Sequence, residues 1–310
     1  MQVYFIKRII NAVVVLWLVT SITFCLMHAI PGGPFTANKN LPPQVKANIE
    51  ARYKLNDPLF IQYKDYMTNL LHGDLGPSFK YQGRTVNDII VENVPASFEL
   101  GFEAVLFCLI FGVPLGMWAA IKQGRWQDKL VGFLTTIGIS VPSFVMAALL
   151  IKTFAMELDL LPVALWYDWS SRVLPVVTLS VMPMAFVAKL TRSSMLEVLG
   201  QEYIKTARAK GLSEFRIMLR HALPNAIMPV VTYIGPMTAG VLTGSFVIEN
   251  IFAIPGLGKF FITSIYNRDY TVILGITVFY SAIVILLNML VDLVYPLLDP
   301  RIKLGKEGDA

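Results

Sequence analysis

The sequence predicts an all-α polytopic membrane protein with six transmembrane helices, and its composition and charge pattern lead to this fold class. Hydrophobic residues make up 55% of the 310 residues and charged residues only 15%, whereas a soluble globular chain has about 45–50% and about 25%. The mean hydropathy is +0.60. Disorder, collagen and a disulfide-stapled secreted fold are excluded, because apolar content is high, the 21 glycines are aperiodic and there are only two cysteines.

Six charge-poor runs have the length of a membrane span. A hydrocarbon core about 30 Å thick requires about 20 helical residues at about 1.5 Å each. The runs are approximately Ile9–Ile30, Ser97–Ile121, Leu130–Ile151, Arg172–Lys189, Ala226–Ile248 and Thr271–Leu290.

The first and fourth runs each have an alternative interpretation. The first follows Lys7 and Arg8, but it is longer than the about 7–15 apolar residues of a secretion signal, so we expect a retained membrane helix. The fourth contains Pro175 and Pro183. A buried helix of a soluble domain is the alternative for this run.

The distribution of Lys and Arg predicts that both termini are cytoplasmic. With the N-terminus inside, the inner segments carry 15 of the 26 Lys and Arg residues, and seven of these lie between the fourth and fifth runs. The two short outer loops carry only Lys259 and Arg268. An excess of positive charge in the inner segments sets the orientation of a membrane protein.

The long outer segment is expected to form a small helical cap. An amphipathic stretch runs from Pro42 to Lys54, and Asp57 followed by Pro58 predicts the start of a helix that Gly73 ends. Thr85 to Asp88 resembles a capping box that starts another short helix. In the next outer loop, Trp166, Tyr167 and Trp169 are typical of an interfacial aromatic belt. The predicted division is 1–30, 31–96, 97–298 with the inner loop at about 197–224, and a cytoplasmic tail at 299–310.

No arrangement of residues predicts an active site, a metal site or a nucleotide site on this chain. The three histidines lie far apart in unlike segments, and Cys25 and Cys108 are expected to be packed apolar thiols. The stretch from Ala253 to Phe260 approaches a phosphate-binding loop but has Ala and Phe where that loop needs Gly and Ser or Thr. An intramembrane enzyme is therefore the least favoured class.

Acidic residues and helix disruptors within the spans are candidates for a transport path. Glu99 and Glu103 have i, i+4 spacing and would face an outer vestibule together; hydrated or snorkelling end residues are the alternative. Kinked helices fit a transporter, and they fit ordinary bundle packing almost as well. The remaining candidates for the path are Pro142, Pro183, Pro236, Gly240 and Gly244.

The inner loop between the fourth and fifth runs is the most informative segment. Gly211 is a natural left-handed residue between two short helices, and Ser213 is positioned to cap the second. Small Ala207 and Ala209 would permit close approach of a partner. The expected apolar anchors are Leu212, Phe215 and Leu219. The alternative is a basic amphipathic segment on anionic lipid.

This loop resembles the EAA loop of ABC importer permeases. Its motif positions are occupied by Lys205, Thr206, Ala207, Gly211, His221, Leu223 and Pro224. Lys205, Thr206 and His221 depart from the general pattern, but the stretch from Thr206 to Gly211 is similar to the form in peptide and nickel permeases. Similar stretches include Pro31–Phe35, Gly73–Phe79, Pro255–Gly258 and Asn267–Tyr270. Together they span nearly the whole chain, and they look most like the B-type permease subunits of oligopeptide importers.

The resemblance implies a type I ABC importer fold and an assembly of several subunits in a bacterial cytoplasmic membrane. The expected partners are a homologous permease, two cytoplasmic ATPase subunits that hold ATP and Mg, and a periplasmic or lipid-anchored peptide-binding protein. No cofactor is expected on this chain. The resemblance assigns coupling to the ATPase to Lys205, Thr206, Ala207, Arg208, Ala209, Gly211, Leu212, Phe215, Arg216, Leu223 and Pro224.

The implied function is import of oligopeptides by alternating access. Within the same family, import of dipeptides, nickel chelates or heme remains open. An ion-coupled peptide carrier working alone is the alternative from another class, and it would require Glu99 or Glu103.

Overall fold

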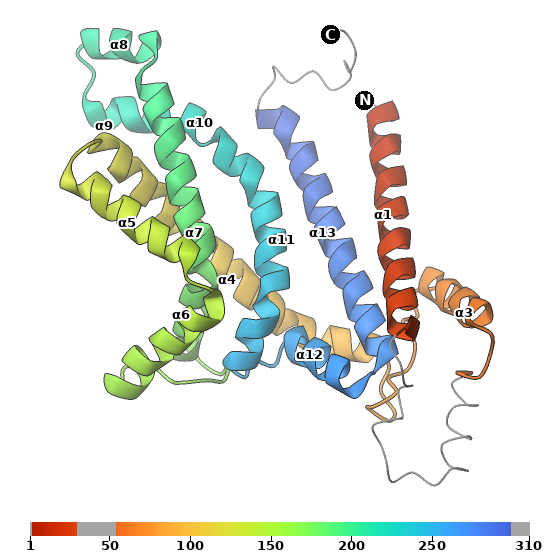
Figure 1. The fold of residues 1–310 in the computed structure, drawn as a ribbon. Coiled ribbons are helices and arrows are strands. Elements are labelled where there is room, and N and C mark those ends of the chain that lie inside the picture. Colours follow the sequence, from red (N-terminus) through yellow and green to blue (C-terminus); the bar gives the residue numbers. More distant parts are fainter. Residues whose placement is uncertain (1, 30–53, 299–310) are drawn as a thin grey trace. The chain divides into compact units, whose positions relative to one another are not determined.

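The computed structural model describes residues 2–29 and 54–298, and in these ranges its regular elements are all helices (Figure 1). The amphipathic stretch predicted from Pro42, the Pro31–Phe35 stretch and the tail at 299–310 lie outside the described residues, apart from Lys54. The chain divides into two compact units, residues 1–95 with 256–285 and residues 96–255 with 286–310. The predicted domain 97–298 is therefore shared between both units.

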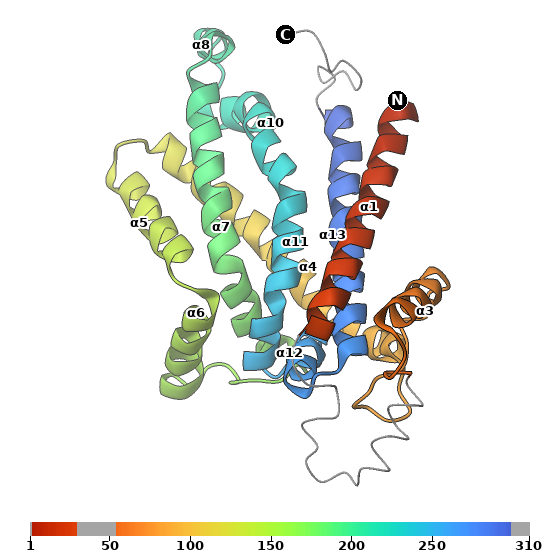
Figure 2. The same ribbon diagram turned by 45° about the vertical axis from the view of Figure 1, so that its right-hand side comes forward.

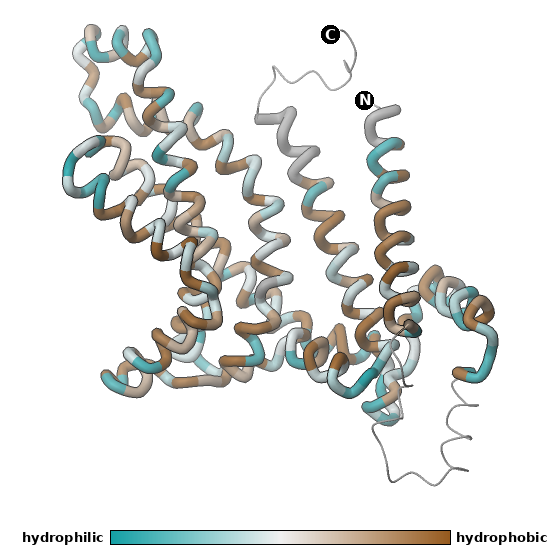
Figure 3. The backbone as a smooth tube through the Cα atoms, in the orientation of Figure 1, coloured by the Kyte–Doolittle hydropathy of each residue, from teal (hydrophilic) through white to brown (hydrophobic). Residues whose placement is uncertain are grey.

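The first unit contains the helices at the two ends of the chain. They are α1 (Gln2–Ala29), α3 (Leu59–Leu71), the start of α4 (Val86–Ile121), α12 (Leu257–Asn267) and most of α13 (Tyr270–Leu298). Helix α1 is hydrophobic over most of its length after a hydrophilic turn near its N-terminal end (Figure 3). Cys25 on α1 is exposed, so the prediction of a packed thiol is wrong for this residue.

The second unit contains the remaining helices. They are the rest of α4, α5 (Trp126–Ser140), α6 (Ser143–Leu150), η1 (Ile151–Glu157), α7 (Trp169–Leu199), α8 (Glu202–Ala209), α9 (Glu214–Arg216), η2 (Ile217–Ala222), α10 (Leu223–Ala226), α11 (Met228–Ile251) and the end of α13. Helix α7 is central to this unit, because α5, α6, α10 and α11 all contact it.

Among the described residues, five helices are long and apolar enough to cross a membrane, and α5 with α6–η1 forms a sixth span if the bent pair counts as one. The bend of 109° contradicts a straight third span at Leu130–Ile151. Val141 is extended at ψ 120°, and Pro142 follows it. A proline has no amide hydrogen and disfavours helical backbone in the residue before it, so the helix stops there.

The helix starts also differ from the sequence prediction. The capping box at Thr85 and Asp88 is confirmed, since the Thr85 amide donates to Asp88 and the Asp88 amide donates to Thr85 Oγ1. It begins the long α4 rather than another short helix. Pro58 is the N-cap of α3 and not its first helical residue, whereas Gly73 ends the run in a left-handed conformation with φ of 76°. The fourth span is a long helix, because a capping box between Asp168 and Ser171 starts α7 earlier than predicted.

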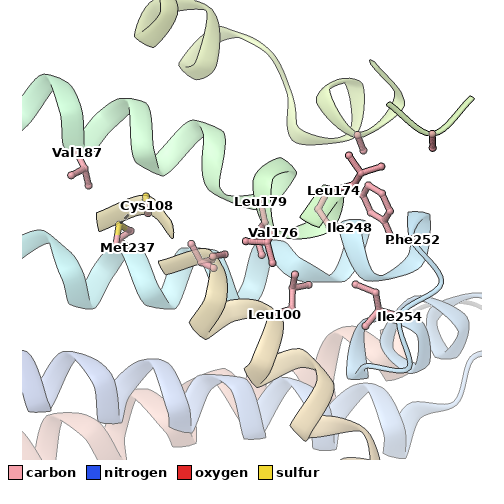
Figure 4. Close-up of a cluster of buried hydrophobic side chains, with 14 of the residues drawn as sticks. Leu100, Cys108, Leu174, Val176, Leu179, Val187, Met237, Ile248, Phe252 and Ile254 are labelled. Atoms are coloured by element: carbon pink, nitrogen blue, oxygen red, sulfur yellow. Dashed lines mark hydrogen bonds between the residues drawn. The ribbon is translucent and has the colours of Figure 1, made fainter. Parts of the chain in front are cut away.

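Side chains from α4, α7 and α11 form the main apolar core of the second unit (Figure 4). Cys108 packs there as predicted, with its thiol 3.8 Å from the Met237 sulfur. Gly116 lets α4 approach α7 closely, because a Cβ at this position would lie 2.7 Å from Thr191 Cβ and against the Ala188 carbonyl oxygen. Small residues at such crossings are the usual basis of helix packing in membranes.

In the first unit, Asp269 joins two distant stretches of the sequence. Its buried carboxylate accepts hydrogen bonds from the Ser78 hydroxyl (2.5 Å), the Lys80 amide (3.1 Å) and the Phe79 amide (3.2 Å). It also accepts from the Thr271 hydroxyl at 3.0 Å, at the start of α13. The turn before α4 and the start of α13 are thereby held together.

Candidate coupling loop and translocation surface

The inner loop is a compact turn of helices, from α8 through α9 and η2 to α10 (Figures 1 and 2). Gly211 is left-handed, with φ of 77°, and reverses the chain as predicted. Across this turn, Arg208 Nε donates to Glu214 Oε1 at 2.8 Å, and Arg208 Nη2 donates to Oε2 at 3.3 Å. The hydrogen bonds from the guanidinium lower the pKa of the Glu214 carboxyl. The pair is exposed, so we assign it to fixing the turn rather than to stability.

The buried side of this loop packs against the ends of α4 and α7, at Ala120 and Met195. Ile204 and Ala207 from α8 and Ile217 and Ala222 from η2 are buried there, and Leu212 packs against them. The prediction that Ala207 permits close approach of a partner needs correction, because Ala207 is buried. Leu212 is partly buried, and its role as an anchor stays a prediction. Ser213 is the N-cap of α9, but its side chain makes no capping hydrogen bond.

The exposed side of this inner loop, away from its buried side, presents an aromatic side chain. Phe215 is 72% exposed and Leu219 is 41% exposed, so these two of the three expected anchors are available to a partner. Lys205 is paired with Glu202 at 2.7 Å. The other predicted coupling residues that are exposed are Thr206, Arg208, Ala209, Gly211, Arg216 and Pro224, while Leu223 is partly buried.

A groove of about 480 Å³ separates part of α7 from α11. Its lining includes Phe186, Tyr233 and Pro236, and the rings of Phe186 and Tyr233 lie 4.5 Å apart. Of the predicted path residues, only Pro236 lines this groove. Gly240 follows on the same helix and is exposed, as is Pro142 at the α5–α6 bend. Pro183 is partly buried in α7, and Gly244 continues α11.

Glu99 and Glu103 both pair with Arg172, which the sequence analysis identified only as the start of the fourth span. Arg172 lies 2.7 Å from Glu103 and 3.1 Å from Glu99. Trp166 donates its indole N–H to Glu99 at 3.1 Å, and its ring lies 4.8 Å from the Arg172 guanidinium carbon. The two acids thus share one counter-ion, and Trp166 belongs to this polar brace. That Glu99 and Glu103 face an outer vestibule stays a prediction.

Replacing Arg172 with methionine is expected to lower the free energy of unfolding in detergent by about 1–3 kcal/mol, since both carboxylates lose their charged partner. Changing Glu99 and Glu103 to glutamine in the same chain should recover most of that loss. Lys152→Met is the matched control, because the Lys152 side chain is 69% exposed and lies 3.7 Å from Glu157. Equal melting temperatures for Arg172→Met and the unaltered protein would contradict the brace.

Two further charged groups in the spans were not predicted from the sequence. Glu249 is fully buried near the end of α11 and accepts a hydrogen bond from Ser245 at 2.7 Å. Asp128 pairs with Arg192 through two hydrogen bonds of 2.5 and 2.8 Å. In the sequence, Ser245 one turn before Glu249 is the local feature that could have indicated a buried, hydrogen-bonded glutamate. In the part of the chain that the structure describes, no three His, Cys, Asp or Glu side chains form a possible metal site.

Comparison with known families decides the class of this chain. The family described as "Binding-protein-dependent transport system inner membrane component" matches residues 112–304, and its N-terminal counterpart matches residues 1–101. The chain belongs to this family. It is therefore a multi-pass inner-membrane permease, as the resemblance of its inner loop predicted.

Several relatives of this permease are similar over nearly their whole length. The dipeptide transport system permease protein DppB of Bacillus subtilis is 50% identical over 98% of this chain and 99% of the relative. The oligopeptide transport system permease protein OppB of Salmonella typhimurium is 45% identical over 97% and 99%. The Escherichia coli OppB is 44% identical over the same shares.

Among solved structures, the permease is similar to a chain of the inward-facing MetNI methionine ABC transporter. That match has a TM-score of 0.54 and 18% identity, and it covers 68% of this chain and 96% of the other. An amino acid ABC transporter matches with a TM-score of 0.50 and 19% identity. The fold is therefore that of type I ABC importer permeases, which confirms the predicted fold class.

Proposed function

We propose that this permease imports peptides as one subunit of an ATP-driven importer. Oligopeptides are the proposed substrate. The relatives named as oligopeptide and dipeptide permeases support this substrate class. The proposed partners are a second permease, two ATPase subunits that bind ATP and Mg, and a peptide-binding protein on the outer side. Both termini and the loop around Gly211 face the cytoplasm, in agreement with the excess of Lys and Arg in the inner segments.

The observation that carries the coupling role is the exposed Phe215 on a loop whose buried side packs against the ends of α4 and α7. Helix α7 leads directly into α8, and α10 leads into α11, so the loop connects two spans that border the groove at Pro236. A rigid loop transmits a displacement, whereas a flexible one absorbs it. Movement of an ATPase bound at Phe215 would therefore change the separation of α7 and α11.

A Phe215→Ala variant tests this role. Truncation of a central aromatic anchor typically costs about 2 kcal/mol, which is about a 30-fold loss of affinity. We expect loss of ATPase co-purification and of ATP-dependent peptide uptake in proteoliposomes. Tyr266→Ala is the matched control, because Tyr266 on α12 is 82% exposed. The control should leave ATPase co-purification unchanged.

Gly211→Val provides a second test of the same loop. A β-branched residue is strained in the left-handed conformation that Gly211 adopts, although a Cβ there would meet open space. The strain should displace Phe215 relative to α8. Unchanged peptide uptake and unchanged ATPase co-purification in both variants would refute the coupling role.

Dipeptide import is the second candidate, because the DppB of Bacillus subtilis is 50% identical to this chain. Competition of unlabelled dipeptides and longer peptides for uptake by the assembled importer distinguishes the two. Uptake driven by an ion gradient without ATPase subunits would instead support an ion-coupled carrier and refute the proposal.

A further inference from the structure

Helix α3 is amphipathic, and part of its apolar half is exposed. At about 100° per residue, one half carries Leu59, Phe60, Tyr63, Met67, Leu70 and Leu71, and the other half carries Gln62, Lys64, Asp65, Thr68 and Asn69 together with Ile61. Phe60 is 76% exposed and Leu71 is 84% exposed. A surface helix that leaves such side chains in water would lose hydrophobic stabilisation.

Tyr63 from the apolar half and the neighbouring Gln62 from the polar half contact the C-terminal part of α1. The Tyr63 hydroxyl lies 2.7 Å from Ser21 Oγ, and its ring centroid lies 5.3 Å from that of Phe24. Gln62 Oε1 lies 3.3 Å from His28 Nε2. Figures 1 and 2 both show α3 beside this end of α1 and oblique to it.

These contacts set the depth of α3 in the bilayer. A hydrocarbon core of about 20 helical residues that starts at Ile9, after the charged Lys7 and Arg8, ends near His28. Ser21 lies about 10 Å inside that boundary at about 1.5 Å per residue. Because α3 contacts α1 from Ser21 to His28, it lies level with the outer part of the span. Interfacial amphipathic helices bury their apolar face by about 5–10 Å, which matches this depth.

We propose that α3 is an interfacial helix whose Phe60 and Leu71 side chains insert among the acyl chains of one leaflet, continuing the lipid-facing surface of α1. Lys64 borders the apolar half, where its stem can follow the lipid while its ammonium reaches the headgroups. On the polar half, Asp65 and Asn69 line a cavity of about 290 Å³ together with Phe24 and His28 of α1, so these two polar side chains face protein and not lipid. The assignment of α3 to the outer leaflet rests on the proposed orientation of the permease. The depth of α3 in the bilayer rests instead on its contacts with α1.

Nitroxide labels in the assembled importer test the insertion. Single cysteines replace Phe60, Leu71 or Thr68 in a Cys25→Ala, Cys108→Ala background, and the importer is placed in nanodiscs of phosphatidylethanolamine and phosphatidylglycerol. Labels at positions 60 and 71 should relax several-fold more with oxygen, which enters lipid, than with a water-soluble nickel chelate. The label at Thr68, on the polar half, should show the reverse order and is the matched control.

Two outcomes would overturn the proposal. Preference for the nickel chelate at positions 60 and 71 would place this face in water. Protection from both relaxants at these positions would show that a protein partner covers it. Phe60 and Leu71 are exposed, so the labels remove little packing and the variants should fold. Reaction of an impermeant maleimide with Thr68→Cys in intact cells tests the orientation separately.

Discussion

Replacing Asp269 with alanine is expected to destabilise the first unit by about 3 kcal/mol or more. The change removes the acceptor of the Ser78 hydroxyl and of the Phe79 amide. The Lys80 amide keeps a hydrogen bond to Ser78 Oγ, and the Thr271 hydroxyl keeps one to the Pro77 carbonyl oxygen. A buried donor that loses its partner costs about 1–3 kcal/mol, and bonds to a charged acceptor are at the upper end. The unfolding midpoint of the purified permease in detergent measures this loss.

The control for this prediction is an acid within the turn that Asp269 binds. Asp74 is exposed, and its carboxylate accepts a hydrogen bond from the Gly76 amide at 2.8 Å. Asp74→Ala should therefore cost clearly less than Asp269→Ala. The loss of stability in Asp269→Asn should lie between those of the two alanine variants. The amide keeps one acceptor oxygen, but its NH2 group would face the N–H and O–H donors that the second carboxylate oxygen now accepts from. Equal midpoints for the two alanine variants would contradict a joining role for Asp269.

Introducing leucine at Gly116 is expected to prevent correct packing of α4 against α7. The Cβ alone would lie 2.7 Å from Thr191 Cβ and closer still to the Ala188 carbonyl oxygen, so the helices must separate. Extra volume in a packed interior typically costs about 1–3 kcal/mol, and a whole leucine side chain against backbone exceeds that range. We expect loss of most monodisperse protein after extraction, measured by size-exclusion chromatography.

Gly132→Leu is the matched control for the helix crossing. A Cβ at Gly132 on α5 would meet open space, so the same substitution adds no clash there. Leucine is also a better helix former than glycine by roughly 1 kcal/mol. Retention of a normal chromatographic profile by Gly116→Leu would show that α4 and α7 do not need this close approach.

The crossing at Gly116 lies close to the start of the coupling loop. The Arg192 amide lies next to the position that a Cβ of Gly116 would take, and the Arg192 side chain pairs with Asp128 at the start of α5. Helices α4, α5 and α7 therefore meet shortly before α7 continues into α8.

Much of the fold follows from local patterns in the sequence. Runs of apolar residues set the spans, because a membrane helix must satisfy its backbone internally over the thickness of the bilayer. Gly73 and Gly211 end their helices in left-handed conformations as predicted, and Thr85 with Asp88 starts α4. Each of these features depends on residues within one or two turns of each other, so it can be read without knowing the fold.

The tertiary structure alone decided which distant residues meet. Arg172 joins Glu99 and Glu103 across two helices, and Asp269 joins a turn that lies 190 residues earlier in the sequence. Ala207 is buried in the small core beneath the loop, whereas Phe215 is exposed, and only the packing of the loop decided between them. The sequence by itself indicated the class of permease and most of the spans, but not the 109° bend within the third. Packing decided the pairings, because helical periodicity defines the faces of a helix but not what each face contacts.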